Sequence, residues 1–245
     1  MVLRQLPYLL AGTFPDGPLA GAALTLWMAV LACAGATVLG IGLAVLLDRA
    51  PVPLARAARA LLACLRAVPV LMLVFWTYFL LPMLAGVHVG EVRTVMLALA
   101  LIGAAYIAQV MEAGFDAIGR GQRNAALALG MTPMQALWQV VLPQSLRAML
   151  PSLGNIWVSL AKDTSLAYIV GVVELSTVAT QVNGRSVGYA AEVFLAVALL
   201  YFVICLSIES VAAGLLLLTR RRARAASRLR RAWGSVALAP ARPKG

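Results

Sequence analysis

Long apolar stretches recur along this chain, and they restrict its fold more than any other feature. A helix that crosses a bilayer needs about 20 consecutive apolar residues. Five stretches of about this length are present, at residues 21–47, 61–81, 94–115, 151–173 and 191–218. Hydrophobic residues make up 62% of the chain and charged residues 12%, against about 25% charged in a typical soluble domain. The sequence therefore predicts an all-α, polytopic transmembrane bundle with five spans.

Basic residues fall mainly on one side of this predicted bundle. Of the 20 Lys and Arg residues, 16 lie on this side. Four are in or near the link between the first two spans, three lie between the third and fourth spans, and nine follow Leu218. Because cytoplasmic loops are enriched in Lys and Arg, this side should be cytoplasmic and the N-terminus outside. The chain then divides into a periplasmic N-terminal segment (1–19), a transmembrane domain (20–218) with a cytoplasmic loop at 116–150, and a basic cytoplasmic tail (219–245). We expect the tail to meet the membrane surface, and we expect no nucleic acid partner.

Residues that would hold a metal, a cofactor or a nucleotide do not form recognisable motifs. The three cysteines, Cys33, Cys64 and Cys205, lie far apart in apolar runs, without the spacing of a zinc or redox site. No GxxxxGK[ST] sequence occurs that could cradle the phosphates of ATP. We therefore expect no metal, no cofactor and no enzymatic activity in the chain itself.

A polar island, Asn124–Pro143, lies between the third and fourth apolar stretches. Its first half has a helical pattern that Gly130 should end, because glycine readily takes the left-handed conformation at a helix C-terminus. Thr132 should begin a second helix, in which Gln135 completes a capping box. We expect this second helix to stop before Pro143. Two short helices meeting at a bend would form an exposed knob for a partner, and we call residues 124–143 the knob.

The knob resembles the cytoplasmic signature of the membrane subunits of ABC importers, which reads Glu-Ala-Ala, three residues, Gly, nine residues, Ile-x-Leu-Pro. The chain keeps this spacing, with Asn in place of Glu and Val in place of Ile, in Asn124, Ala125, Ala126, Gly130, Val140, Leu142 and Pro143. The run Lys162-Asp163-Thr164-Ser165-Leu166 looks like the polar amino acid (histidine, glutamine and glutamate) permease branch. The segment Asn-Ala-Ala-Leu-Ala-Leu-Gly is most similar to the corresponding segment of the glutamate/aspartate import permeases. The resemblance covers roughly residues 20–218.

This resemblance implies a function and a set of partners. It implies a type I ABC importer permease fold in the bacterial inner membrane, with two such subunits, either identical or homologous, around one translocation path. The seven signature residues would dock on cytoplasmic ABC ATPase subunits, which supply ATP hydrolysis. A solute-binding protein would deliver an amino acid from outside, with glutamate or aspartate as the narrower expectation.

Two adjacent charges, Lys162 and Asp163, stand near the middle of the predicted fourth span. A central Lys or Asp costs roughly 2.5–3.5 kcal/mol each on insertion scales. Neighbours i and i+1 project in different directions around a helix, so each charge needs its own partner or a water-filled cavity. One interpretation places Lys162 on the substrate pathway. The other is a structural ion pair of Lys162 with Glu112 or Glu209.

The predicted third span contributes Gln109 and Glu112, which share one helix face at spacing i, i+3. The resembling family usually has Glu and Arg at these positions, so this chain departs from it at both. Gln109 could equally form a hydrogen bond between helices. The candidate substrate-pathway residues are Lys162, Asp163, Thr164, Ser165, Gln109 and Glu112.

Two other functions compete with the importer subunit. An ion-coupled secondary transporter could use Lys162 and Asp163 as a relay, but it should contain inverted repeats, and we find none in the sequence. A structural or sensory membrane subunit could bind anionic lipid or a regulator through its basic tail. The secondary transporter would have no use for the knob, and the structural or sensory subunit predicts that substitutions in the pathway leave uptake intact.

Overall fold

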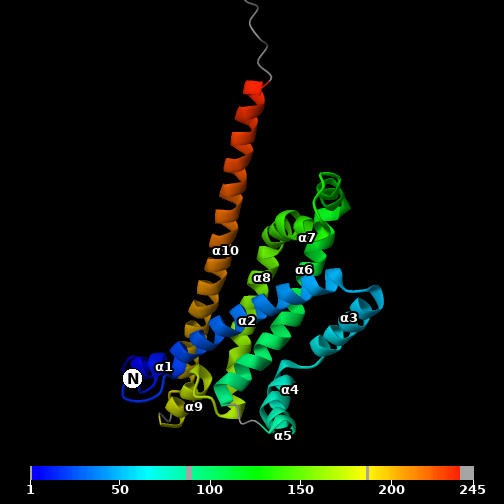
Figure 1. Cartoon of the computed structure of the whole chain (residues 1–245). Helices are drawn as coiled ribbons and strands as arrows, with labels where there is room; N and C mark the ends of the chain where they lie inside the picture. The colour runs from blue at the N-terminus through cyan, green and yellow to red at the C-terminus, as the bar shows by residue number, and fades with distance from the viewer. Residues whose placement is uncertain (1, 87–89, 186–187, 238–245) are drawn as a thin grey trace, which may run out of the picture.

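The computed structural model describes residues 2–86, 90–185 and 188–237, and these residues form helices without a β-strand. The all-α prediction is therefore confirmed for this part of the chain (Figure 1). The α-helices are α1 (Val2–Ala11), α2 (Gly21–Arg49), α3 (Val52–Ala67), α4 (Val70–Phe75), α5 (Leu81–Ala85), α6 (Glu91–Ala128), α7 (Pro133–Ala136), α8 (Leu142–Asp163), α9 (Leu175–Arg185) and α10 (Ala190–Ala237). Two π-helical segments, η1 (Trp76–Leu80) and η2 (Leu137–Val141), and a 3-10 segment, η3 (Thr164–Val170), connect some of them.

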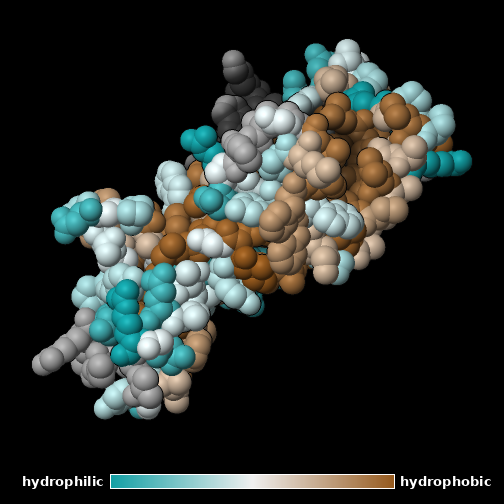
Figure 2. Space-filling view, turned by 90° about the horizontal axis from the view of Figure 1, so that it is seen from below, coloured by the Kyte–Doolittle hydropathy of each residue, from teal (hydrophilic) through white to brown (hydrophobic). Residues whose placement is uncertain are grey.

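Helix α6 is the centre of the bundle, and α2 and α8 pack against it most extensively. In its most apolar window 67% of the residues are buried, against 28% in α2 and 17% in α10. Figure 1 shows α2 crossing obliquely over α6 and α8. Many large hydrophobic side chains of α2 and α10 remain exposed, and hydrophobic residues cover a broad part of the face in Figure 2. Such a surface suits a bilayer, where apolar side chains meet lipid.

Small residues allow α2 and α6 to approach closely. A Cβ atom added at Gly40 would lie 2.6 Å from the Cβ of Ile107 and 2.9 Å from the carbonyl oxygen of Ala104. One at Gly103 would lie 2.7 Å from the Cβ of Ala36. Small residues at helix contacts let backbones pack closely in membranes, where the hydrophobic effect does not draw apolar helices together.

Three of the described helical segments are long and apolar enough to cross a membrane: Gly21–Arg49, Glu91–Gly119 and Ala190–Thr219. A fourth crossing is possible if α3 and the segment Val70–Leu84 count as one span, although they are bent by 101°. Val68 and Pro69 cause this break, since both have extended backbones and proline disfavours helix at the residue before it. The predicted span at 61–81 is thus divided between α3 and the helical segment that begins at Val70.

The knob helix does not stop before Pro143, so that prediction is wrong. η2 leads directly into α8, which contains Pro143 at its second position. Pro82 likewise follows the other π-helical segment, η1, after one intervening residue. Proline removes an N–H and crowds the carbonyl four residues earlier. The wider π turn just before each proline accommodates this change within a continuous helical segment.

The helix at the position of the predicted fourth span has different limits from those expected, and it is not among the candidate spans of the described residues. α8 begins at Leu142, carries Pro151 in its interior and ends at Asp163, where the 3-10 segment begins. Lys162 therefore lies in the last turn of a helix and not at its middle. Proline is tolerated inside membrane helices because neighbouring groups can satisfy the freed backbone atoms.

The end of the bundle away from the knob is held by a buried carboxylate. Glu174 is fully buried and caps α9, since its side chain accepts a hydrogen bond from the backbone N–H of Thr177 at 3.0 Å. It also accepts from the hydroxyls of Tyr201 on α10 at 2.7 Å and Thr25 on α2 at 3.4 Å. Burial raises the pKa of this carboxyl, which lies outside the three candidate spans. Glu174 thereby ties α2, α9 and α10 together.

Candidate functional site

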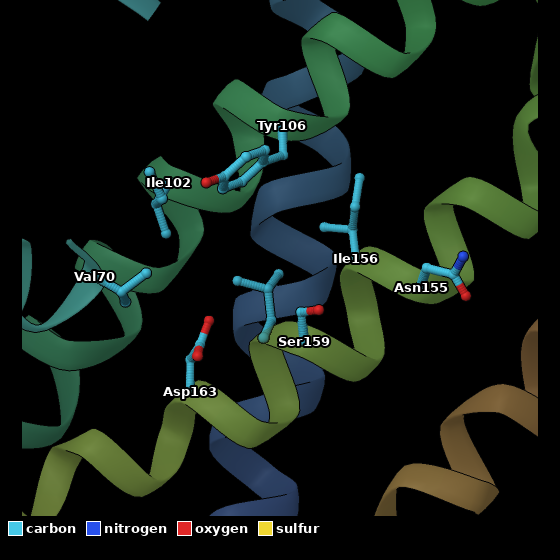
Figure 3. Close-up of a pocket in the computed structure, with 8 residues that line it drawn as sticks. Val70, Ile102, Tyr106, Asn155, Ile156, Ser159 and Asp163 are labelled. Atoms are coloured by element: carbon cyan, nitrogen blue, oxygen red, sulfur yellow. The ribbon is translucent and has the colours of Figure 1, made fainter. Parts of the chain in front are cut away.

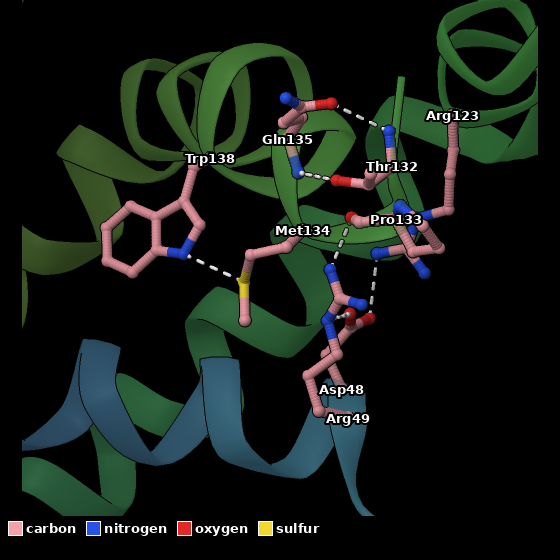
Figure 4. Close-up of polar contacts among 8 residues, drawn as sticks. All are labelled: Asp48, Arg49, Arg123, Thr132, Pro133, Met134, Gln135 and Trp138. Atoms are coloured by element: carbon pink, nitrogen blue, oxygen red, sulfur yellow. Dashed lines mark hydrogen bonds and ion pairs between the residues drawn. The ribbon is translucent and has the colours of Figure 1, made fainter. Parts of the chain in front are cut away.

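The bend of the knob has the local structure predicted from its sequence. Gly130 has a φ of +83° after the last turn of α6. The Thr132 hydroxyl accepts from the backbone N–H of Gln135 at 3.3 Å, and the Gln135 side chain accepts from the backbone N–H of Thr132 at 2.8 Å (Figure 4). The capping box is confirmed. Because these signals act over a few residues, the tertiary fold does not override them.

An ion pair just before the knob and a hydrogen bond within it connect this region to the end of α2. Arg123 contacts Asp48 with an N–O distance of 2.8 Å, and Arg49 donates a hydrogen bond to the carbonyl oxygen of Pro133 (Figure 4). The predicted site did not include Asp48 or Arg49, because their partners lie 75 and 84 residues away along the chain. A movement of the knob would therefore act directly on α2.

The seven signature residues divide into two groups. Asn124, Ala125 and Gly130 are exposed, whereas the remaining four, Ala126, Val140, Leu142 and Pro143, are buried or half-buried. The first group can touch a partner, and the second shapes the knob.

Large hydrophobic side chains are also exposed on the knob. Leu129 is 81% exposed, and Met134 and Trp138 are about half exposed. The indole N–H of Trp138 contacts the Met134 sulfur at 3.1 Å (Figure 4). Aromatic and methionine residues are typical of the cores of protein interfaces. The sequence prediction missed these three residues, which lie between the signature positions.

A cavity of about 370 Å³ lies between α4, α6 and α8. Its volume falls within the range of roughly 300–1,000 Å³ that is usual for small-molecule sites. It is lined by Val70, Ile102, Tyr106, Asn155, Ile156, Ser159, Leu160 and Asp163. Figure 3 shows Tyr106 and Asp163 facing the same space from opposite sides.

Asp163 is the only acidic or basic side chain among the residues that line this cavity. It is the last residue of α8, and the chain continues directly into the 3-10 segment η3. Asn155 and Ser159 precede it by eight and four residues and so share its helix face. Together these side chains offer an amide, a hydroxyl and a carboxyl group. The site can therefore hold a small polar molecule through an ammonium group.

The other predicted pathway residues lie outside the cavity lining. Lys162 is exposed and forms no ion pair within the described part of the chain. Thr164 is buried and donates its hydroxyl to the carbonyl oxygen of Ala161 at 2.7 Å, and Ser165 is half-buried. Gln109 is exposed on α6.

Glu112 pairs with Arg59 of α3, with an N–O distance of 2.8 Å, so it is not the partner of Lys162. Near this ion pair, α3 is bonded to α6 beside the cavity. The Arg66 guanidinium donates to the carbonyl oxygen of Ala105 at 3.2 Å, and the Tyr106 hydroxyl donates to that of Arg66 at 3.4 Å. These contacts place the broken α3–α4 pair along one wall of the cavity.

Apolar helices long enough to cross a membrane, a cavity in the bundle and an exposed knob are the features of a helical membrane transport protein. The chain matches the family described as "Binding-protein-dependent transport system inner membrane component" over residues 36–216. It belongs to this family. Members are membrane components of ABC transporters without an ATPase site of their own, and the resemblance seen in the sequence is confirmed.

Related proteins include amino acid permeases. The glutamate/aspartate import permease protein GltK of Escherichia coli O6:H1 is 33% identical over 213 residues, which cover 84% of this chain and 91% of the relative. The glutamine transport system permease protein GlnP of Escherichia coli K12 is 32% identical over 192 residues, covering 78% and 87%.

Solved structures show the same fold. A crystal structure of an amino acid ABC transporter with histidines has a TM-score of 0.69 and 28% identity, and covers 81% of this chain and 91% of its own. The MetNI methionine ABC transporter in an inward-facing conformation has a TM-score of 0.66 at 23% identity, over 79% and 94%. The chain therefore has the type I ABC importer permease fold that the resemblance implied.

Proposed function

We propose that this chain is the permease subunit of an ATP-driven amino acid importer and that the amino acid passes through the Asp163 cavity. The observation that carries the proposal is a single carboxylate at the end of α8, facing a cavity of suitable size with amide and hydroxyl groups beside it. The amino acid names of the relatives support the substrate class.

Asp163 meets the α-ammonium group that every amino acid carries. A hydrogen bond to a charged group contributes about 1.5–3 kcal/mol, which corresponds to a ten- to hundredfold change in affinity. Asn155 and Ser159 provide hydrogen bonds for the carboxylate or the side chain of the substrate. Lys162, next to Asp163 but outside the lining, contributes at most indirectly.

The charge of the cavity also selects among amino acids. An acidic side chain would bring a second carboxylate close to Asp163, and like charges repel in a site of low dielectric constant. No Lys or Arg is among the lining residues to compensate. We therefore infer that the substrate has a neutral or basic side chain, in contrast to the narrower expectation of glutamate or aspartate, which the name of the relative GltK favours.

Partners complete the transport cycle. The exposed residues Asn124, Ala125 and Gly130, with the neighbouring Leu129 and Trp138, dock on a cytoplasmic ABC ATPase subunit, while a solute-binding protein delivers substrate on the other side. A second permease copy or homologue closes the cavity. This arrangement requires five crossings, with the knob and tail in the cytoplasm and the N-terminus outside. The uneven distribution of basic residues supports that orientation.

The test compares Asp163→Asn with Lys162→Met in the complex with its ATPase and binding protein, reconstituted in proteoliposomes. Asp163→Asn preserves shape and removes the charge, so uptake should fall at least tenfold while ATP hydrolysis without substrate stays unchanged. Lys162→Met removes the adjacent charge outside the cavity lining and should retain most uptake. Normal uptake by Asp163→Asn, or a loss confined to Lys162→Met, would contradict the assignment.

A further inference from the structure

An apolar groove runs between α2, α8 and α10, apart from the proposed substrate cavity. Two adjoining hollows of about 530 and 330 Å³ form it, and Thr37 and Trp157 line both. Its lining on α2 extends from Leu26 to Ile41, which is about 22 Å at ~1.5 Å per residue. One leaflet of a bilayer has a hydrocarbon depth of about 15 Å. The groove is therefore long enough for an acyl chain of one leaflet.

The polar side chains of the groove bond within the protein. The Trp157 indole donates to the Thr37 hydroxyl oxygen at 2.9 Å. The hydroxyls of Ser207 and Thr219 donate to backbone carbonyl oxygens of their own helix at 2.7 and 2.9 Å. The surface left for a ligand is consequently apolar along most of the groove.

The groove and the substrate cavity lie on different faces of α8. Asn155 and Ser159 line the cavity, and Trp157 lines the groove. Trp157 is two residues from each, which places it about 160° around the helix from both. If paired subunits share a path on the cavity side, the groove is left facing the bilayer.

The knob end of the groove is basic. Arg147 lines this end, is exposed, and has no ion pair in the part of the chain that the structure describes. No acidic residue lines either hollow. An apolar chain alone gives no selectivity in lipid, because lipid tails are as apolar as leucine, so the charge must decide what binds.

We propose that this groove binds an anionic phospholipid of the cytoplasmic leaflet, with an acyl chain between α2 and α10 and the phosphate at Arg147. Basic pockets between membrane helices on the cytoplasmic side are suited to anionic headgroups. Pro143, a residue of the knob, lines the same end of the groove. The bound lipid therefore supports the junction between the knob and α8. The proposal rests on the proposed function for the assignment of the leaflet and for the exposure of the groove to the bilayer.

Lipid retention by the transporter complex tests this site. The complex is purified in detergent, incubated with dioleoylphosphatidylglycerol or dioleoylphosphatidylcholine, and analysed by native mass spectrometry. The wild type should retain the anionic lipid in preference. Arg147→Gln should lower that retention about fivefold, which is the effect of one basic residue near a membrane surface. Leu215→Trp, which fills the groove without changing a charge, should lower the retention of both lipids.

Matched controls separate the groove from general charge and bulk. Arg93→Gln removes an exposed arginine from the opposite end of the described structure, and Leu217→Trp enlarges an exposed α10 side chain outside the lining. Both should retain lipid as the wild type does. Equal losses of lipid retention in Arg147→Gln and Arg93→Gln would overturn the proposal. Disulfide cross-linking of two complete chains through Val211→Cys would also overturn it, because a second copy of the chain would then occupy the groove. If Leu215→Trp does not fold, the exposed Arg147→Gln still decides the question.

Discussion

Gly40→Ala should destabilise the protein at the contact between α2 and α6. The added methyl group would lie 2.6 Å from the Ile107 Cβ and 2.9 Å from the Ala104 carbonyl oxygen, so backbone atoms must move. Overpacking of this kind costs about 1–3 kcal/mol. The same substitution also increases helix propensity, by up to about 1 kcal/mol, which offsets part of the cost.

Gly42→Ala is the matched control for this prediction. It lies on the same helix, and nothing is within 4 Å of its added Cβ atom. Both variants gain the same helix propensity, so the difference between their free energies of unfolding should equal the cost of the close contact, about 1–3 kcal/mol. For a chain of this size that corresponds to about 2–12 °C between their melting temperatures. Thermal unfolding of the purified variants in one detergent measures it. Equal melting temperatures would refute the close packing of α2 on α6.

Three further perturbations address the knob, the topology and the buried carboxylate. Gly130→Asp strains a residue at φ +83° and adds a charge on the docking surface. The variant should still insert in the membrane, while substrate-stimulated ATP hydrolysis falls at least tenfold. Normal stimulation would show that this surface does not dock on the ATPase. In a chain without its native cysteines, Thr180→Cys should react with a membrane-impermeant thiol reagent on intact cells, and Gln139→Cys should not. The reverse labelling pattern would contradict the orientation with the knob in the cytoplasm. Because burial raises the pKa of Glu174 above its ordinary value of 4.5, the folded state keeps the proton to higher pH than the unfolded chain. The stability that this group contributes should therefore fall as pH rises from the pKa of Glu174 in the unfolded chain to its higher pKa in the folded state. Glu174→Gln should flatten the dependence of melting temperature on pH.

Features set by a few neighbouring residues could be predicted from the sequence. The capping box of Thr132 and Gln135 and the left-handed Gly130 depend on local geometry, and both are present. The limits of α8 could not be predicted, because the π turn before Pro143 lets the helix continue through a proline that normally ends one. This earlier start places Lys162 in the last turn of α8.

The cavity was only partly visible in the sequence. Asp163 was identified by its charge, but Asn155 and Ser159 were missed, although their spacing of four residues places all three on one helix face. Tyr106 joins them from α6, about 50 residues earlier in the sequence, and only the packing of α6 against α8 brings it there. Likewise, the charge of Glu112 indicated that this residue could form an ion pair, but the sequence did not identify Arg59 as its partner.

Substrate protection of Ser159→Cys tests the central claim most directly. In the reconstituted complex without native cysteines, a small thiol reagent should label this residue in the cavity wall. A neutral or basic amino acid that the complex transports should slow the labelling at least tenfold, and Lys162→Cys, outside the lining, should be labelled at an unchanged rate. If the transported amino acid leaves the labelling of Ser159→Cys unchanged, or if only acidic amino acids protect it, the proposed path and its selectivity are wrong.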